Sequence, residues 1–462
     1  MTKPAVEPAS FRDPSGFVFT RGDTLLRQVQ QPYRDDYDTL MASGLYESLV
    51  GAGLLIPHVE ESLQTAASAG AYRVLRPEPV PFVSYPYEWC FSQLQDAALA
   101  TLTIQREALR FGMSLKDASA YNIQFRAGKP ILIDTLSFER TREGRPWVAY
   151  GQFCRHFVAP LALMARTDVR LGRMMRTFID GIPLDLASRL LPTRTRLNPG
   201  VLIHIHLHAA AQMRAARTET SSASVRGVGR AAALGLLDSL EAVVRGQSWR
   251  PAGSAWADYY EHTNYTAEAM AAKRRIVSEM LDGISPAPRT AWDLGANTGL
   301  FSRLAAERGI DTVAWDIDPG AVELNYRACR AEGETRLLPL LQDLTSPSPD
   351  LGWDLRERKS LVRRGPADVV LALALVHHLA IANNVPLGSV ASFLRSMGRW
   401  LIVEFVPKSD SQTRRLLANR DDIFAGYTRE GFENAFRSGF EILRQVDLPG
   451  SERTIYLMRG RD

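Results

Sequence analysis

The second half of the chain alternates between short, continuously apolar runs and longer stretches whose apolar residues recur at helical spacing. The continuous runs, which we predict to be buried strands, are 290–294, 312–315, 336–341, 367–374 and 400–405. The stretches that we predict to be helices are 267–281, 300–308, 321–331 and 390–396. Strands and helices in this alternation are typical of βαβ units. We therefore expect an α/β domain with a doubly wound, mostly parallel sheet.

The first half of the chain is less regular and predicts an α+β domain. Residues 16–29 predict a hairpin, and residues 37–50 and 89–111 predict helices. A stretch rich in Ala, Arg, Ser and Thr at 209–235 predicts a linker or exposed loop. The division that we expect is a disordered N-terminus (1–14), an accessory domain (15–210), a linker with a helix (211–253) and the α/β domain (254–462).

Composition and charge narrow the class of protein. Apolar residues make up 45% of the chain and charged residues 23%, as in soluble globular proteins. A net charge of +4 is too small to favour nucleic acid or an anionic membrane as a partner. No apolar run is long enough for a membrane span, and residues 1–10 lack the apolar core of a secretory signal, so we expect a cytoplasmic protein. The three cysteines lie far apart, so we expect buried, reduced thiols and no metal site.

A glycine loop between a predicted strand and a predicted helix is the strongest candidate for chemistry. The loop runs from Asp293 to Gly299 with the sequence DLGANTG. Its glycines, Gly295 and Gly299, let the backbone approach a ligand closely, and Asn297 tolerates left-handed backbone. Backbone N–H groups at the start of the following helix can bind a carboxylate, and Asp293 at the strand tip can accept hydrogen bonds from an amino group.

Two later strands also end in acidic residues. Asp316 follows the second strand, where an acid is placed to hold ribose hydroxyls, and Asp343 follows the third, where it can hydrogen-bond an adenine amino group. Asp316 and Asp318 both lie after the second strand, and we predict that Asp316 is the acid that holds the ribose hydroxyls. A dinucleotide-binding Rossmann unit is the alternative, but its GxGxxG spacing would need another glycine after Gly299.

This ordered series resembles the class I, seven-stranded, Rossmann-like S-adenosylmethionine-dependent methyltransferases, over about residues 254–461. The loop is similar to their DxGxGxG motif, with Asn297 in place of the middle glycine. The resemblance implies S-adenosylmethionine as the cofactor. The cofactor-binding residues that it implies are Asp293, Gly295 and Gly299 around the methionine part, Asp316 at the ribose and Asp343 at the adenine, with Asn297 of the loop as a further cofactor-binding residue.

Candidates for the chemistry follow the fourth and fifth strands. An oxygen acceptor needs its proton removed, and histidine is a suitable base near neutral pH, so we predict His377 or His378 in this role. The alternative is that one histidine packs and the other caps a helix. Glu404, at the end of the fifth strand, either touches the acceptor or bonds to backbone. Tyr259, Tyr260 and Tyr265 either form a lid over the cofactor or pack as ordinary helix residues.

The first half also contains a pattern of polar residues around predicted strands. Asp117 and Asn122 precede a short strand that ends at Asp134, and this resembles the catalytic and metal-binding segments of kinase-like phosphotransferases. The resemblance implies a nucleotide and Mg²⁺ site. Lys116 stands where the family has His-Arg, Thr135 follows Asp134 where the family has Phe, and Arg27 is the nearest candidate for the strand lysine. The alternative is a helical substrate-binding or dimerising domain in which Asp117, Asn122 and Asp134 cap turns.

Taken together, these patterns predict a two-domain methyltransferase. The signature of nucleobase amino-methylators is absent after the fourth strand, which favours O- or C-methylation of a small molecule or glycan over nucleic acid. Two alternatives stay open: a bifunctional or regulatory protein with an ATP-binding N-terminal domain, and a non-catalytic scaffold that binds S-adenosylmethionine. The sequence does not indicate an oligomeric state.

Overall fold

A computed structural model describes residues 3–142, 144–217, 229–251, 266–418 and 421–461. Its contacts divide the chain into two compact units. Unit 1 comprises Met1–Arg250 together with Leu351–Arg358, and unit 2 comprises Pro251–Asp350 and Lys359–Asp462. The return of Leu351–Arg358 to unit 1 is a feature that no pattern in the sequence indicated.

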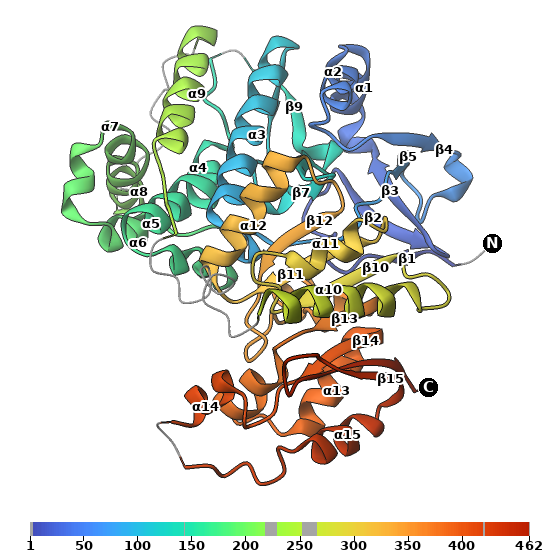
Figure 1. Ribbon diagram of the computed structural model, residues 1–462. Coiled ribbons are helices and arrows are strands. Elements are labelled where there is room, and N and C mark those ends of the chain that lie inside the picture. Colours follow the sequence, from blue (N-terminus) through green and yellow to red (C-terminus); the bar gives the residue numbers. More distant parts are fainter. Residues whose placement is uncertain (1–2, 143, 218–228, 252–265, 419–420, 462) are drawn as a thin grey trace. The chain divides into compact units, whose positions relative to one another are not determined.

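Unit 2 contains a seven-stranded, mostly parallel sheet (Figure 1). Its strands are β10 (Thr290–Leu294), β11 (Asp311–Asp316), β12 (Leu337–Leu341), β13 (Ala367–Ala372), β14 (Gly398–Phe405), β15 (Phe440–Asp447) and β16 (Thr454–Gly460). The strand order is β12-β11-β10-β13-β14-β16-β15, in which the first five strands pair in parallel and β16 is antiparallel to both its neighbours. The chain order reverses between β10 and β13, and ligands of open α/β sheets bind at such a point, beyond the carboxyl ends of the strands.

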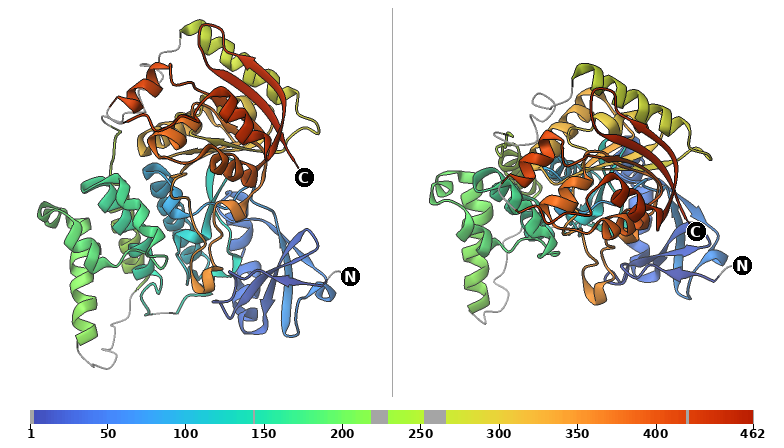
Figure 2. Two further views of the ribbon diagram at one scale, coloured as in Figure 1. Left: turned by 90° about the horizontal axis from the view of Figure 1, so that it is seen from below. Right: turned by 60° about the horizontal axis from the view of Figure 1, so that its bottom comes forward.

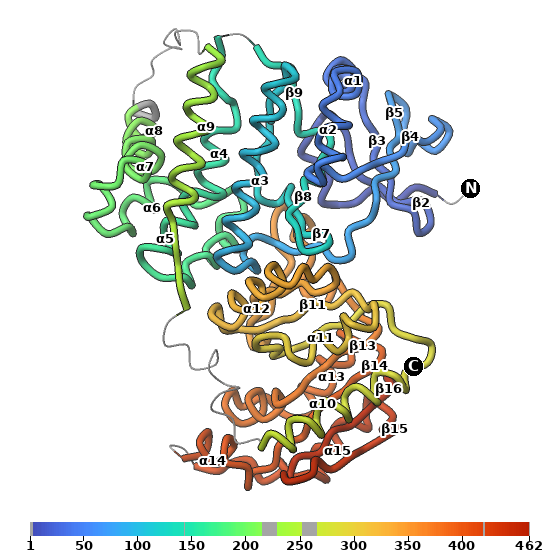
Figure 3. Tube along the Cα trace, turned by 45° about the horizontal axis from the view of Figure 1, so that its top comes forward, coloured from blue at the N-terminus to red at the C-terminus, as the bar shows by residue number. Residues whose placement is uncertain are grey.

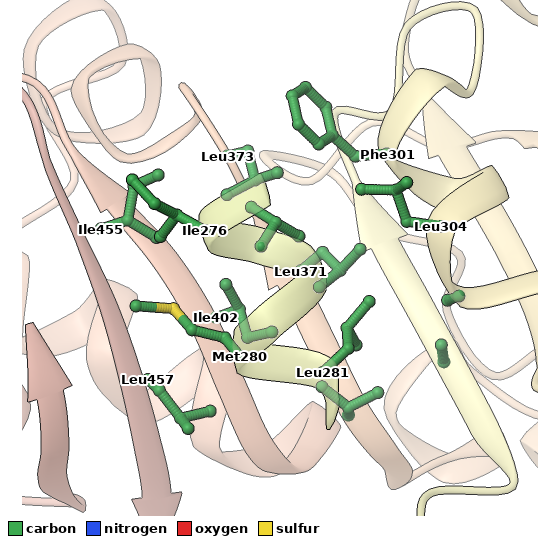
Figure 4. Packing of buried hydrophobic residues seen from close by; sticks show 14 of the residues in the cluster. Ile276, Met280, Leu281, Phe301, Leu304, Leu371, Leu373, Ile402, Ile455 and Leu457 are labelled. Atoms are coloured by element: carbon green, nitrogen blue, oxygen red, sulfur yellow. The ribbon is translucent and has the colours of Figure 1, made fainter. Parts of the chain in front are cut away.

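Helices connect and cover these strands. They are α10 (Ala267–Asp282), α11 (Leu300–Ala306), α12 (Pro319–Glu332), α13 (Leu387–Met397), α14 (Ser411–Leu417) and α15 (Arg429–Arg437). The apolar stripe of α10, which includes Ile276 and Met280, packs with Leu371, Ile402 and Leu457 of the sheet (Figure 4). Figure 2 shows α10 lying along the strands of unit 2. This packing holds α10 against the sheet.

Four helices of unit 2, α10, α12, α14 and α15, begin at residues whose side chains accept hydrogen bonds from free backbone N–H groups. The Thr266 side chain accepts a hydrogen bond from the N–H of Ala269 at the start of α10, and Asp318 accepts one from Gly320 at the start of α12. Gly333, with a φ of 68°, follows the last turn of α12. Asp318 is therefore used as a helix cap.

Unit 1 begins with a five-stranded antiparallel sheet in the order β1-β2-β3-β5-β4. The strands are β1 (Ala5–Val6), β2 (Gly16–Arg21), β3 (Thr24–Gln30), β4 (His58–Glu61) and β5 (Ala71–Pro77). Helices α1 (Arg34–Ala42) and α2 (Leu45–Gly51) follow β3 (Figure 3). We predicted one helix here, but Gly44, with a φ of 86°, breaks it. Residues 3–14, expected to be disordered, instead contribute β1 and the ion pair of Arg12.

The rest of unit 1 is built around the long helix α3 (Phe91–Arg110). Two short antiparallel pairs accompany it: β6 (Met113–Leu115) with β9 (Phe138–Arg140), and β7 (Ile123–Arg126) with β8 (Lys129–Leu132). The remaining helices are α4 (Tyr150–Phe153), α5 (Ala159–Arg166), α6 (Leu184–Leu190), α7 (Pro199–Val201), α8 (His208–Arg217) and α9 (Arg230–Arg245). Helix α9 packs against α3, so the predicted linker region contains a helix of the core of unit 1. Within the described residues, no helix has both the length and the apolar character needed to cross a membrane.

Candidate functional site

The glycine loop joins the end of β10 to the start of α11 in left-handed backbone. Gly295, Asn297 and Gly299 have φ values of 76°, 53° and 82°. Asn297 is accommodated because its side-chain oxygen accepts a hydrogen bond from the N–H of Thr298 at 2.7 Å. A Cβ atom at Gly299 would lie 2.6 Å from the side chain of Asn325, so both the backbone angle and the space require glycine there.

Two buried carboxylates lie beside this loop. Asp293 accepts a hydrogen bond from the hydroxyl of Ser302 at 2.6 Å. Asp316 accepts hydrogen bonds from the backbone N–H groups of Asn297 (2.8 Å) and Asp318 (2.9 Å). Burial raises the pKa of Asp293 to about 7 and the pKa of Asp316 to about 6. Desolvation disfavours the ionised forms, so both groups gain from a ligand that offers positive charge or hydrogen-bond donors.

A pocket of about 250 Å³ opens at the carboxyl ends of β10, β11, β12 and β13. The predicted residues that line it are Asp293, Gly295, Asn297, Asp316, Asp343 and His378. Gly299 lies outside the lining and shapes the turn. The lining residues that the sequence reasoning missed include Met270, Lys273, Phe301, Gln342 and Asn383.

The two histidines after β13 occupy different environments. His378 lines the pocket, whereas His377 lies outside its lining and is only 1% exposed. Their rings are 4.1 Å apart. Burial lowers the pKa of His378 to about 4 and places that of His377 well below its usual value. Both imidazoles are therefore neutral at pH 7, and only His378 is placed to meet a ligand.

A buried chain of four charged side chains lies next to the pocket. The Lys273 ammonium is 2.6 Å from Glu404, Glu404 is 3.6 Å from Arg453, and Arg453 is 2.8 Å from Asp410. Glu404 is fully buried and is not among the residues that line the pocket. The pairing of Lys273 with Glu404, which lies 131 positions later in the chain, leaves no signal in the sequence, because a lysine on an amphipathic helix usually lies on the solvent side.

The three tyrosines predicted as a lid, Tyr259, Tyr260 and Tyr265, lie outside the described residues.

In unit 1, the predicted polar residues lie near one another. Asn122 hydrogen-bonds Asp117, and the charge of Asp134 acts on Asp117, whose pKa is raised mainly by burial. Arg27 forms an ion pair with Asp134 at 2.6 Å. Asp117 also accepts the N–H of Ser119, and Asp134 that of Leu136. Among the described residues, no group of three or more His, Cys, Asp or Glu is arranged to hold a metal ion.

Comparison with known proteins gives a relative similar over nearly the whole chain. The chain is 36% identical over 461 residues to "Nodulation protein NoeA" of Rhizobium meliloti (strain 1021), covering 98% of this chain and 96% of that protein. No protein-family model matches the chain.

Three of the matching solved structures show distant likeness, each over less than half of this chain. WbdD is 14% identical over 44% of this chain and 43% of its own, with a TM-score of 0.31. The magnesium protoporphyrin IX methyltransferase ChlM of Synechocystis PCC 6803 with bound SAH is 18% identical over 45% and 93%, with a TM-score of 0.31. The N-methyltransferase NodS of Bradyrhizobium japonicum WM9 is 11% identical over 42% and 98%, with a TM-score of 0.30.

Proposed function

The chain belongs to the family of the nodulation protein NoeA, and we propose that it transfers a methyl group from S-adenosylmethionine to an acceptor. The observation that carries the proposal is the lining of one pocket by Asp293, Asp316 and Asp343, which come from the ends of three neighbouring strands. Such a row offers one carboxylate to the cofactor's ammonium, one to its ribose hydroxyls and one to its adenine amino group.

The residues of the pocket fit this cofactor. The tight loop at Gly295 and Gly299 keeps side chains away from the backbone beside β10, so a ligand can approach closely. Asp316 is held in place by two backbone N–H groups and presents a carboxylate to a diol. The cofactor supplies a methyl group on a positively charged sulfonium, whose charge is lost on transfer. The apolar side chains Leu373 and Leu375 exclude water from this region.

The acceptor meets the pocket at His378. A neutral imidazole accepts a hydrogen bond from an acceptor hydroxyl and orients it, but the low pKa of His378 makes it a weak base. Orientation is therefore its main contribution, and a proton passes to it only as the methyl group is transferred. The acceptor is a small molecule or glycan methylated at oxygen or carbon, rather than a nucleic acid.

Calorimetric titration with S-adenosylmethionine tests the cofactor. We expect Asp316→Ala to abolish binding, because the ribose loses its carboxylate. Asp318→Ala is the matched control: it removes the cap of α12, which costs about 1 kcal/mol of stability, but leaves the pocket lining intact. Equal loss of binding in both variants, or retention in Asp316→Ala, would overturn the assignment.

Turnover separates an enzyme from a scaffold that only binds the cofactor. His378→Ala should keep the affinity for S-adenosylmethionine within a few-fold and lower the rate of methyl transfer about 10²-fold or more. His377→Ala should act through stability instead, because His377 does not line the pocket. If turnover survives in His378→Ala, the role given to His378 is wrong.

A second candidate function is that unit 1 binds ATP–Mg²⁺. The observation that favours it is the proximity of Asp117, Asn122 and Asp134, with Arg27 of β3 paired to Asp134. Two carboxylates and an amide are oxygen ligands that suit Mg²⁺, and a strand arginine suits a phosphate. The turn-capping hydrogen bonds of Asp117 and Asp134 support the alternative, a purely structural role.

Thermal unfolding with and without ATP–Mg²⁺ decides between these roles of unit 1. A nucleotide at a hundred times its dissociation constant adds about 2.7 kcal/mol of stability, and this gain should vanish in Asn122→Ala. An unfolding temperature that does not change with ATP–Mg²⁺ favours the structural role.

A further inference from the structure

One surface of unit 1 carries large apolar side chains that neither of the proposed sites uses. They come from three elements: α6, a 3-10 helix over Thr193–Leu197 and a π-helix over Leu202–Leu207. These side chains, which we call the apolar face, are Leu190, Leu197, Ile203 and Leu207. They are between 40% and 87% exposed, and Leu197 is the most exposed of them. Single exposed apolar residues are ordinary, but several from one stretch of chain indicate a binding surface.

A buried histidine joins the elements that carry the apolar face. His206 lies on the π-helix. Its Nδ1 is 2.8 Å from the hydroxyl of Ser188 on α6, and its Nε2 is 3.0 Å from the hydroxyl of Thr195 on the 3-10 helix. Leu190 and Leu197 each follow one of these hydroxyl residues by two positions. They therefore lie close to the π-helix and belong to one surface with its exposed side chains.

The same surface carries positive charge without acidic partners. Residues 184–214 contain four arginines and a single acidic residue, Asp185, which pairs with Arg189. Arg194 and Arg196 are exposed, and they form no ion pair with any residue that the structure describes. The small net charge of the whole chain hides this local excess, because acidic residues elsewhere balance it.

We propose that this surface docks unit 1 on an anionic lipid surface. The apolar face enters the headgroup region, and Arg194 and Arg196 contact the negative lipid headgroups. Apolar side chains flanked by arginines are typical of elements that lie on a membrane without crossing it. The proposal concerns unit 1 alone and does not depend on the methyl transfer proposed above.

Other occupants match this surface less well. A two-fold contact between two copies of the chain through this surface brings arginines of the same charge together. A nucleic acid offers phosphates to the arginines but no apolar layer to Leu197. An anionic lipid surface offers both, since its headgroups attract the arginines and its acyl chains receive the leucine.

Flotation of the full chain with lipid vesicles tests the proposal. One set of vesicles is pure phosphatidylcholine, and the other also contains the anionic phosphatidylglycerol. We expect the wild type to bind the anionic vesicles at least tenfold more tightly, because each arginine near an anionic surface contributes about fivefold. Raising the salt from about 0.1 M to about 1 M should remove most of this preference, because it shortens the range of charge interactions from about 10 Å to about 3 Å.

Two variants separate the charged from the apolar contribution. Arg194→Gln with Arg196→Gln should weaken binding to the anionic vesicles about 25-fold, at about fivefold for each arginine. Leu197→Gln should weaken it about tenfold, because a leucine side chain no longer leaves water. Leu63→Gln is the matched control, because Leu63 is also an exposed leucine of unit 1 but lies outside this surface, and it should bind as the wild type does.

The contrary outcomes are distinct. Failure of the wild type to float with anionic vesicles at low salt overturns the proposal, and so does an equal loss of binding in Leu197→Gln and Leu63→Gln. Binding that depends on the arginines alone also overturns it and fits a nucleic acid or free phosphate. Self-association without vesicle binding, measured by sedimentation and abolished in Leu197→Gln, would instead make this surface a contact between copies of the chain.

Discussion

The carboxyl groups of Asp293 and Asp316 make ligand binding depend on pH near neutrality. In the proposed function the cofactor's ammonium and ribose hydroxyls bind the ionised carboxylates, and burial raises the pKa values of these two groups to about 7 and 6. As the pH falls from 7.5 to 5.5, the affinity for S-adenosylhomocysteine should drop on the order of a hundredfold, about 25-fold from Asp293 and about fourfold from Asp316. Titration at several pH values measures this. Asp293→Asn, which cannot ionise, should bind more weakly but with a flatter pH profile, and an equally steep profile would contradict the prediction.

The same burial makes Asp293 a source of instability at high pH. Because its pKa is higher in the folded than in the unfolded chain, the folded state binds more protons between about pH 4 and pH 7. The contribution of this group to stability is therefore fully present below about pH 4 and is lost as the pH rises through 7. Asp293→Asn should be more stable than the wild type at pH 8 and gain less at pH 5.5. Urea unfolding at both pH values tests the sign.

At the scale of elements, helix α11 is preceded and followed by glycines in similar backbone but different surroundings. Gly299 and Gly309 have φ values of 82° and 79°, but only at Gly299 would a Cβ atom collide, with Asn325 and Arg303. Gly309→Ala should cost about 1–2 kcal/mol of stability from backbone strain alone and keep cofactor affinity. Gly299→Ala should cost more and weaken the binding of S-adenosylhomocysteine, as unfolding and titration can show. Equal effects of the two changes would mean that space at Gly299 does not matter.

Elements with strong local signals were predictable from the sequence. The bounds of β10 were predicted residue for residue, and α10 differed by one residue at its end. The loop and its acids could be found because they lie at strand ends, whose position follows from the apolar runs. The break at Gly44 was missed because the apolar spacing continues through it, and β15 was missed because most of its residues are polar or partly exposed. The apolar run of β16 was overlooked, although it is as continuous as those of the parallel strands.

Contacts between residues far apart in the sequence could not be predicted. Lys273 and Glu404 are 131 positions apart, and nothing in the pattern around Lys273 distinguishes it from an exposed lysine. The sequence placed Glu404 at the end of a strand. Its ion pairs with Lys273 and Arg453 make it part of the buried chain of charged side chains and not of the pocket lining. Sequence patterns therefore indicate residues at the ends of strands better than charged pairs that join distant parts of the chain.

At the scale of the whole chain, the crossover between β12 and β13 contributes Leu351–Arg358 to unit 1. Arg12 holds this segment through two hydrogen bonds to Glu357, at 2.8 and 2.6 Å, and the N–H of Trp353 donates to the same carboxylate. The Glu357 side chain is only 2% exposed, so water can hardly take the place of Arg12 as the partner of its carboxylate. Two parts of unit 1 more than three hundred positions apart thus depend on one ion pair.

Arg12→Ala should therefore destabilise the folded chain more than the loss of an ordinary surface ion pair. We expect a cost of about 1–3 kcal/mol, because Glu357 keeps only backbone partners. Arg140→Ala, which removes exposed pairs with Asp35 and Asp36, is the matched control and should cost less than about 1 kcal/mol.

Burial raises the pKa of Glu357, but the hydrogen bonds from Arg12 and Trp353 outweigh it and hold the pKa below its usual value. The stability that the pair contributes is thus present above about pH 4.5 and is lost as the pH falls further. The difference in unfolding free energy between Arg12→Ala and the wild type should then shrink from pH 7 to pH 3.5, and a difference that stays constant would mean that the charge of Glu357 does not hold the segment.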